Sequence, residues 1–159
     1  MITKTAPAPV ENKNALLVPY ALAVCFGIMA LLQLLNFEGF AQNIIAYTVL
    51  PTAPSTTLAV GIIALEIFAI PFLARLWLSK LARLCSAVAV LLAPLVWVLL
   101  VGFGIIRGST AVNASLFGDF LAMPVGEFTF IVSLLLLGLA IWSFALLGGP
   151  KAIRAKRTK

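Results

Sequence analysis

The sequence predicts an all-α integral membrane protein, a bundle of four transmembrane helices with a short amphipathic interfacial helix between the first and the second. Two observations carry this prediction. The chain has 159 residues, of which 63% are hydrophobic and 10% charged, with a mean hydropathy of +1.16, whereas soluble domains are about 45–50% apolar and about 25% charged. The apolar residues also form four continuous runs, each long enough for a helix to cross a ~30 Å hydrocarbon core. The same composition excludes a soluble globule and a disordered chain.

The four runs account for one membrane domain over residues 15–147. We expect spans at about 15–36, 57–78, 84–106 and 128–147, a cytoplasmic tail at 1–14 and a basic cytoplasmic tail at 148–159. Their apolar residues are continuous and do not alternate, which favours helices over barrel strands. Pro19, Pro71 and Pro94 fall inside or at the edge of spans, where membrane helices tolerate proline as a kink. The first run is longer than the core of a signal peptide, so we expect it to be retained.

The basic residues predict the orientation of the chain. Ten of the 11 Lys and Arg lie in the two tails or between Arg75, near the end of the second span, and Arg83, just before the third; Arg107 is the exception. Because Lys and Arg concentrate in short cytoplasmic loops, we expect a multi-pass protein of the bacterial plasma (inner) membrane with both termini cytoplasmic. The loops around residues 37–56 and 107–127 then face outward. The net charge of +6 is explained by basic residues that orient the chain in the membrane and attract anionic lipid. We therefore expect no nucleic-acid partner.

The first outer loop contains the predicted interfacial helix. Phe40, Ile44 and Tyr47 recur at helical spacing, and Pro51 closes the segment. Tyrosine suits the headgroup region, so we expect this helix to lie at the interface with Tyr47 among the headgroups. Two roles stay open: a simple connection between two spans, or a cover over a site at the outer membrane surface.

Glu66 is the most informative residue because it lies near the middle of the second span. A charge at the bilayer midplane costs at least ~2.5–3.5 kcal/mol, so we expect Glu66 to be protonated, to face the bundle interior, or both. Gln33 in the first span and Ser86 or Trp97 in the third are its possible neighbours. Glu66 then forms either an interhelical hydrogen bond worth about 1 kcal/mol or a site for protons, a quinone headgroup or another polar ligand.

Catalytic and metal-binding chemistry has little support. The chain has no histidine, and Asp119 and Glu127 are the only carboxylates of the second outer loop, so we predict no metal site. Cys25 and Cys85 lie at different depths, and we expect both to pack as membrane-buried thiols of low reactivity. The sequence contains no nucleophile–base pair and no nucleotide motif. We therefore expect no independent enzymatic activity and no cofactor.

Three short stretches of the chain, taken together in their order and spacing, form a more specific pattern than any one of them alone. They are Phe40 with Tyr47, Leu50 and Pro51; Leu65-Glu66 with the short basic turn Lys80-Leu81-Ala82-Arg83; and residues 113–126, where Asn113, Phe117, Gly118, Asp119 and Pro124 carry the motif. In these stretches the chain resembles the MauE/DoxX-like family of four-span membrane proteins, whose MauE branch is linked to methylamine utilisation and the methylamine metabolic process. The resemblance covers roughly residues 15–147.

The resemblance implies an accessory protein for the maturation, assembly or anchoring of an extracytoplasmic redox partner. For the MauE branch, the implied partner is the disulfide-rich small subunit of methylamine dehydrogenase. Many family members carry a Cys-x-Cys-Phe-Gly pattern in the last loop, where this chain has Ala114 and Leu116 at the cysteine positions. Neither residue supplies a thiolate, so this loop has no disulfide exchange. The role is then non-redox, or another subunit supplies the thiols.

Two alternative functions stay open beside the accessory role that we favour. The DoxX side of the family implies a quinone-interacting redox subunit in sulfur or thiol oxidation, with Glu66 and the amphipathic segment lining its pocket. A small transporter or channel subunit is the second alternative, and with one midplane acid it would need an oligomer to form a pathway. The expected partners of the favoured function are the lipid bilayer and an extracytoplasmic or membrane protein.

Overall fold

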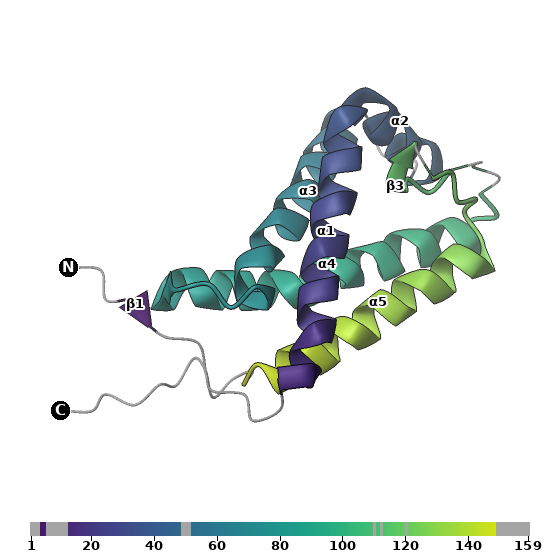
Figure 1. Cartoon of the computed structure of the whole chain (residues 1–159). Coiled ribbons are helices and arrows are strands. Elements are labelled where there is room, and N and C mark those ends of the chain that lie inside the picture. The colour runs from purple at the N-terminus through teal and green to yellow at the C-terminus, as the bar shows by residue number, and fades with distance from the viewer. Residues whose placement is uncertain are drawn as a thin grey trace.

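The computed structural model describes residues 4–5, 13–48, 52–109, 111, 113–119 and 121–148. The protein is a four-helix membrane bundle, as predicted (Figure 1). Its long helices are α1 (Leu17–Leu35), α3 (Thr52–Leu73), α4 (Lys80–Ile106) and α5 (Glu127–Leu146). Each is long and apolar enough to cross a membrane. A 3₁₀ turn, η1 (Lys13–Leu16), precedes α1, and the short helix α2 (Phe37–Thr48) follows it.

The helices pack in a simple order. α3 contacts both α1 and α4, and α4 also contacts α5. The strands β1 (Lys4–Thr5) and β2 (Leu78–Ser79) pair antiparallel, which joins the segment before α1 to the α3–α4 connection. At the other end of the bundle lie α2 and the strand β3 (Leu116–Asp119) (Figure 1). β3 packs against α1, so the chain between α4 and α5 folds back onto the bundle.

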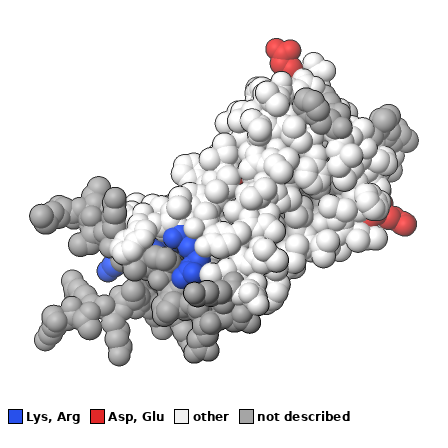
Figure 2. Space-filling view, in the orientation of Figure 1, with Lys and Arg blue, Asp and Glu red and all other residues white. Residues whose placement is uncertain are grey.

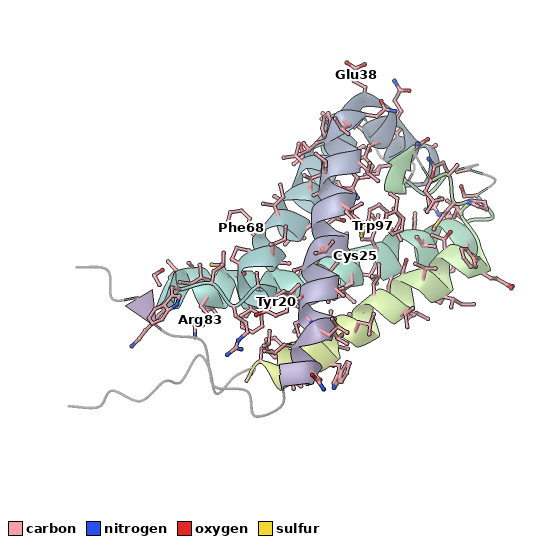
Figure 3. The ribbon with its side chains drawn as sticks, in the orientation of Figure 1. Tyr20, Cys25, Glu38, Phe68, Arg83 and Trp97 are labelled. Atoms are coloured by element: carbon pink, nitrogen blue, oxygen red, sulfur yellow. The ribbon has the colours of Figure 1, made fainter. Side chains whose placement is uncertain are left out.

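The outer surface of the bundle carries many large apolar side chains. Phe26, Met29 and Trp97 are fully buried among α1, α3 and α4, whereas Phe68 and Trp142 are at least half exposed. Figure 3 shows Phe68 on the outer side of α3 and Trp97 between α1 and α4. Because the hydrophobic effect opposes large apolar side chains in water, this exterior is suited to contact with lipid.

The second span differs most from its predicted boundaries, since α3 covers Thr52–Leu73 and not 57–78. Pro54 falls in the first turn, where the missing N–H has no intrahelical acceptor to lose. Past the other end, Arg75 takes a left-handed conformation, with φ of +56°. Ser79 then caps α4 by accepting a hydrogen bond from Ala82 N at 3.2 Å. Residues 80–83, expected as a basic turn before the third span, therefore form the first turn of α4.

A serine of α4 binds the backbone of α3 beside Pro71. The Ser86 hydroxyl donates to the Phe68 carbonyl at 2.6 Å and accepts a hydrogen bond from Phe72 N at 2.9 Å. It thus bridges two backbone groups one helical turn apart, next to a proline that supplies no N–H. Ser86, one of the three expected neighbours of Glu66, has this role instead.

The predicted amphipathic helix is present as α2, and its apolar stripe faces the protein. Phe40 and Ile44 have no exposed surface, and α2 packs against α3 and α4. A helix lying alone at the interface would place such a stripe against acyl chains. Here the turn at Asn36 folds α2 over the end of the bundle, so the stripe fills the space between helices. The side chain of Tyr47 and all of Pro51 lie outside the described residues.

Candidate functional site

The site centres on Glu66, which lies inside the bundle with no exposed surface. Its Oε1 atom accepts hydrogen bonds from Trp97 Nε1 at 2.9 Å and from Gln33 Nε2 at 3.2 Å. Three helices, α1, α3 and α4, therefore meet at one carboxyl oxygen. Of the two expected outcomes, a protonated Glu66 or one that faces the interior, the structure shows the second, and Gln33 and Trp97 are its neighbours.

Gln33 extends this contact out of the helices. The same Nε2 atom donates to the backbone carbonyl of Leu116 in β3 at 3.1 Å. An amide nitrogen carries two hydrogens, and both are used here. We call Glu66, Gln33, Trp97 and the Leu116 carbonyl the polar cluster. It ties three helices to the chain between α4 and α5.

The described residues 113–119 and 121–124, which we call the 113–124 loop, are organised by Asn113. Its Oδ1 accepts hydrogen bonds from Ser115 N at 2.8 Å and Met123 N at 3.3 Å, and its Nδ2 donates to the Gly118 carbonyl at 3.1 Å. Ala114 N also donates to the Met123 carbonyl at 2.6 Å. These bonds fold the loop on itself and leave the Leu116 carbonyl aimed at Gln33.

Gly118 allows the loop to approach α1 closely. Its φ is +60°, and a Cβ atom there would lie 2.8 Å from the Leu32 carbonyl oxygen. Both the conformation and the space therefore require glycine. Ser115, with φ of +59°, is the other left-handed residue of this turn, and its Oγ accepts a hydrogen bond from Asn43 Nδ2 on α2 at 2.6 Å. The loop is thus attached to α2 as well as to α1.

The end of the loop is attached to α5. The Thr129 hydroxyl donates to the Pro124 carbonyl at 2.7 Å, and the Ser133 hydroxyl donates to the Thr129 carbonyl at 2.8 Å. Pro124 therefore marks the entry into α5, as its place before the fourth span suggests. Phe117 is half-buried against the core. The backbone of Asp119 belongs to β3, and its side chain lies outside the described residues.

α2 covers the polar cluster. The ring of Phe40 lies 6.2 Å, centroid to centroid, from the ring of Trp97, tilted by 45°, within the range of favourable aromatic pairs. Figure 3 shows Trp97 below α2, on the inner side of the bundle. This contact fits the hypothesis of a cover better than that of a simple connection between spans.

Three parts of the site are not predicted by the sequence. Asn43 and Ser115 are ordinary polar residues of a helix and a loop, and no local pattern distinguishes them. Leu116 contributes its backbone carbonyl, a group that every residue carries. Only the fold brings these atoms to Gln33 and α2.

The thiols do not belong to the site. Cys25 is half-buried, and its Sγ donates to Met29 Sδ at 3.9 Å within α1. Cys85 is exposed on the outer face of α4, so the expectation that it packs inside the bundle is wrong. Among the described residues no three His, Cys, Asp or Glu side chains gather to hold a metal ion.

An apolar groove lies apart from the polar cluster, between α4 and α5. It has a volume of about 570 Å³ and is lined by Gly102, Ile105, Ile106, Glu127, Phe130, Ile131 and Leu134. Neither Glu66 nor Phe40 lines it. This groove is therefore not the quinone pocket that was expected to be lined by Glu66 and the amphipathic segment.

Fold and site together define a multi-pass α-helical membrane protein in which a buried polar cluster fastens a folded-back loop to the bundle. Comparison of the chain with protein-family models, curated proteins and solved structures gives no match. Function is therefore inferred from the residues of the chain.

Proposed function

We propose that this protein is an accessory membrane protein of the MauE/DoxX type, which assists the maturation, assembly or anchoring of an extracytoplasmic redox partner without thiol chemistry of its own. The observation that carries the proposal is the attachment of the 113–124 loop. Hydrogen bonds from Gln33, Asn43 and Thr129 hold this loop against α1, α2 and α5. A loop held in this way presents one defined surface to a partner.

Rigid presentation matters because ordering a loop on binding costs free energy that lowers affinity. The loop exposes Leu121, Ala122 and Pro124, and Phe128 at the start of α5 is 63% exposed. These exposed apolar residues follow the fastened turn closely in the sequence, and exposed apolar residues at such a place are candidates for contacts between proteins. We call Leu121, Ala122, Pro124 and Phe128 the loop patch.

The side chains at the two expected cysteine positions support a role without thiols. Ala114 and Leu116 are both fully buried. They fill space beneath the loop and have no surface on which a partner disulfide could react. Any disulfide chemistry in the complex then belongs to the partner or to another subunit.

Charge supports placement of the loop patch on the outer side of a bacterial plasma membrane, with both termini cytoplasmic. The visible basic atoms gather at one end of the molecule in Figure 2, and the visible acidic atoms lie away from them. Figure 3 labels Arg83 at the first of these ends and Glu38 at the end that carries α2 and β3. Since short cytoplasmic loops are rich in Lys and Arg, the α3–α4 connection is the cytoplasmic one. A reporter fused after Lys159 that is active only outside the membrane would contradict this orientation.

A photo-crosslinking amino acid at Leu121 tests the proposal in intact cells. The matched control carries the same amino acid at Leu81, which is 72% exposed at the opposite end of the bundle. We expect a covalent adduct with one extracytoplasmic or membrane protein from position 121 and none with that protein from position 81. Adducts with lipid alone from position 121, together with purification of the chain without a partner in mild detergent, would overturn the accessory function.

A further inference from the structure

Two oxygens of the polar cluster are buried and accept no hydrogen bond from the described residues. They are Glu66 Oε2 and Gln33 Oε1. Both belong to side chains that already contact each other through Gln33 Nε2 and Glu66 Oε1. A buried acceptor without a donor is costly, and here two such acceptors belong to side chains that are already joined through their other polar atoms.

The orientation of the Gln33 amide is decided by its second contact. Nε2 faces the Leu116 carbonyl at 3.1 Å. Turning the amide over would place its oxygen against a carbonyl oxygen, and both atoms are acceptors. The nitrogen therefore stays on this side, and Oε1 stays without a donor.

The donors around Glu66 decide where its hydrogen sits. Trp97 Nε1–H can only donate, and both it and Gln33 Nε2 point at Glu66 Oε1. Oε1 is thus an acceptor with two donors, which matches the carbonyl oxygen of a neutral carboxylic acid. Oε2 is left as the position of the hydroxyl.

We infer that Glu66 carries a proton on Oε2 and donates it to Gln33 Oε1, so that acid and amide close a ring of two hydrogen bonds. One proton satisfies both unpartnered oxygens. A metal cation fits less well, because hard cations take six or more oxygen ligands and the described part of the cluster otherwise directs N–H groups at the carboxyl. The inference stands on these contacts alone and does not depend on a partner protein.

Few titratable groups face Glu66. Cys25 on α1 lies near enough to interact with it electrostatically. The cluster residues of α1 and α4 are Gln33 and Trp97, and α2 and the loop add Phe40 and the Leu116 carbonyl, none of which titrates. No charged group among the described residues is paired with the carboxyl. The neutral acid therefore needs no counter-ion.

The proton also holds the loop. Without it, Oε2 becomes an anionic acceptor facing the amide oxygen, and the two repel each other. Rotation of the Gln33 amide relieves this repulsion but withdraws Nε2 from Leu116. Proton occupancy at Glu66 is thus coupled to the attachment of the 113–124 loop.

Infrared spectroscopy of the full chain in lipid nanodiscs tests the proton directly. At neutral pH, the difference between the wild type and Glu66→Gln is expected to show the C=O stretch of a protonated carboxylic acid, shifted in D₂O. Glu38→Gln is the matched control, because Glu38 is exposed on α2, and its difference spectrum is expected to show carboxylate bands. Carboxylate bands in the Glu66→Gln difference would overturn the inference.

Hydrogen–deuterium exchange tests the coupling to the loop. Glu66→Gln keeps an acceptor and a donor in place of the acid and cannot ionise, so it mimics the protonated state. Relative to this variant, we expect the amides of Ala114, Ser115 and Gly118 in the wild type to exchange about tenfold faster once the infrared band has disappeared at alkaline pH, as loss of one hydrogen bond predicts. Equal exchange in the two proteins under those conditions would overturn the coupling.

Discussion

Gln33 on α1 and Glu66 on α3 are joined by a hydrogen bond of 3.2 Å in a fully buried environment, 33 residues apart in the sequence. The second hydrogen of the same amide nitrogen reaches the Leu116 carbonyl. One side chain therefore connects the middle of the bundle to the loop that closes one of its ends.

Replacement of Gln33 by leucine is expected to loosen the loop. Gln33→Leu removes the donor to both Glu66 and Leu116 and leaves the Leu116 carbonyl buried without it. We expect a loss of stability of about 1–3 kcal/mol, measured by thermal unfolding in detergent. Gln42→Leu on the exposed face of α2 is the control and should change stability by less than about 0.5 kcal/mol. A similar stability for the two variants would contradict the role of Gln33.

Gly118 is expected not to tolerate a side chain. Gly118→Ala places a Cβ atom 2.8 Å from the Leu32 carbonyl at a positive φ, and the conformation alone costs about 1–2 kcal/mol. Gly138→Ala is the matched control, since nothing lies within 4 Å of its Cβ position on α5. Alanine there should be neutral or stabilise the helix by about 0.5–1 kcal/mol. Equal melting temperatures of the two variants would refute the close approach of the loop to α1.

Asn113 is expected to control the conformation of the loop through both ends of its amide. Asn113→Asp keeps the acceptor for Ser115 N and Met123 N but loses the donor to the Gly118 carbonyl, whereas Asn113→Ala loses all three bonds. Limited proteolysis in nanodiscs should therefore cleave the loop fastest in the alanine variant, at an intermediate rate in the aspartate variant and slowest in the wild type. Cleavage of all three proteins at one rate would show that these bonds do not hold the loop.

Two buried serines are expected to respond in opposite ways to alanine. Ser86→Ala removes the bridge between the Phe68 carbonyl and Phe72 N, and we expect a loss of about 1 kcal/mol. Ser143 is also fully buried, but its hydroxyl contacts no partner among the described residues. Ser143→Ala removes an unsatisfied group, so stability should stay equal or rise. Unfolding of both variants in the same detergent compares them, and a larger loss at Ser143 would contradict the assignment.

The two thiols are expected to differ in reactivity. Cys85 is exposed on α4, whereas Cys25 is half-buried and contacts Met29. A small membrane-permeant maleimide should therefore label Cys85 first, as judged by mass spectrometry of single-cysteine variants. Faster labelling of Cys25 would place it on the surface of the bundle.

The spans and the interior position of Glu66 could be predicted from the sequence because both depend on the solvent. A bilayer demands about 20 apolar residues per helix, and it penalises an acid that faces lipid. The boundary of the second span could not be placed as well. Pro54 is compatible with a helix only in its first turn, and the left-handed Arg75 lies just past the end of the helix. Where these turns fall depends on the packing of the helix against the rest of the protein.

The choice among the neighbours of Glu66 needed the fold. Gln33, Ser86 and Trp97 all lie within spans, but their rotation and depth follow from the packing of α1, α3 and α4. In the structure Ser86 meets the backbone of α3 beside Pro71, and Gln33 and Trp97 meet the acid.

Composition and hydropathy alone determine that this chain is a membrane protein of four helices, because water and lipid act on each segment separately. They also predict that an acid within a span is neutral, turns inward, or both. Only the tertiary structure decides that Phe40 packs against Trp97 and that the Leu116 carbonyl reaches Gln33. A backbone carbonyl has the same chemistry in every residue, so its partner is decided by where the chain folds back and not by which residue carries it.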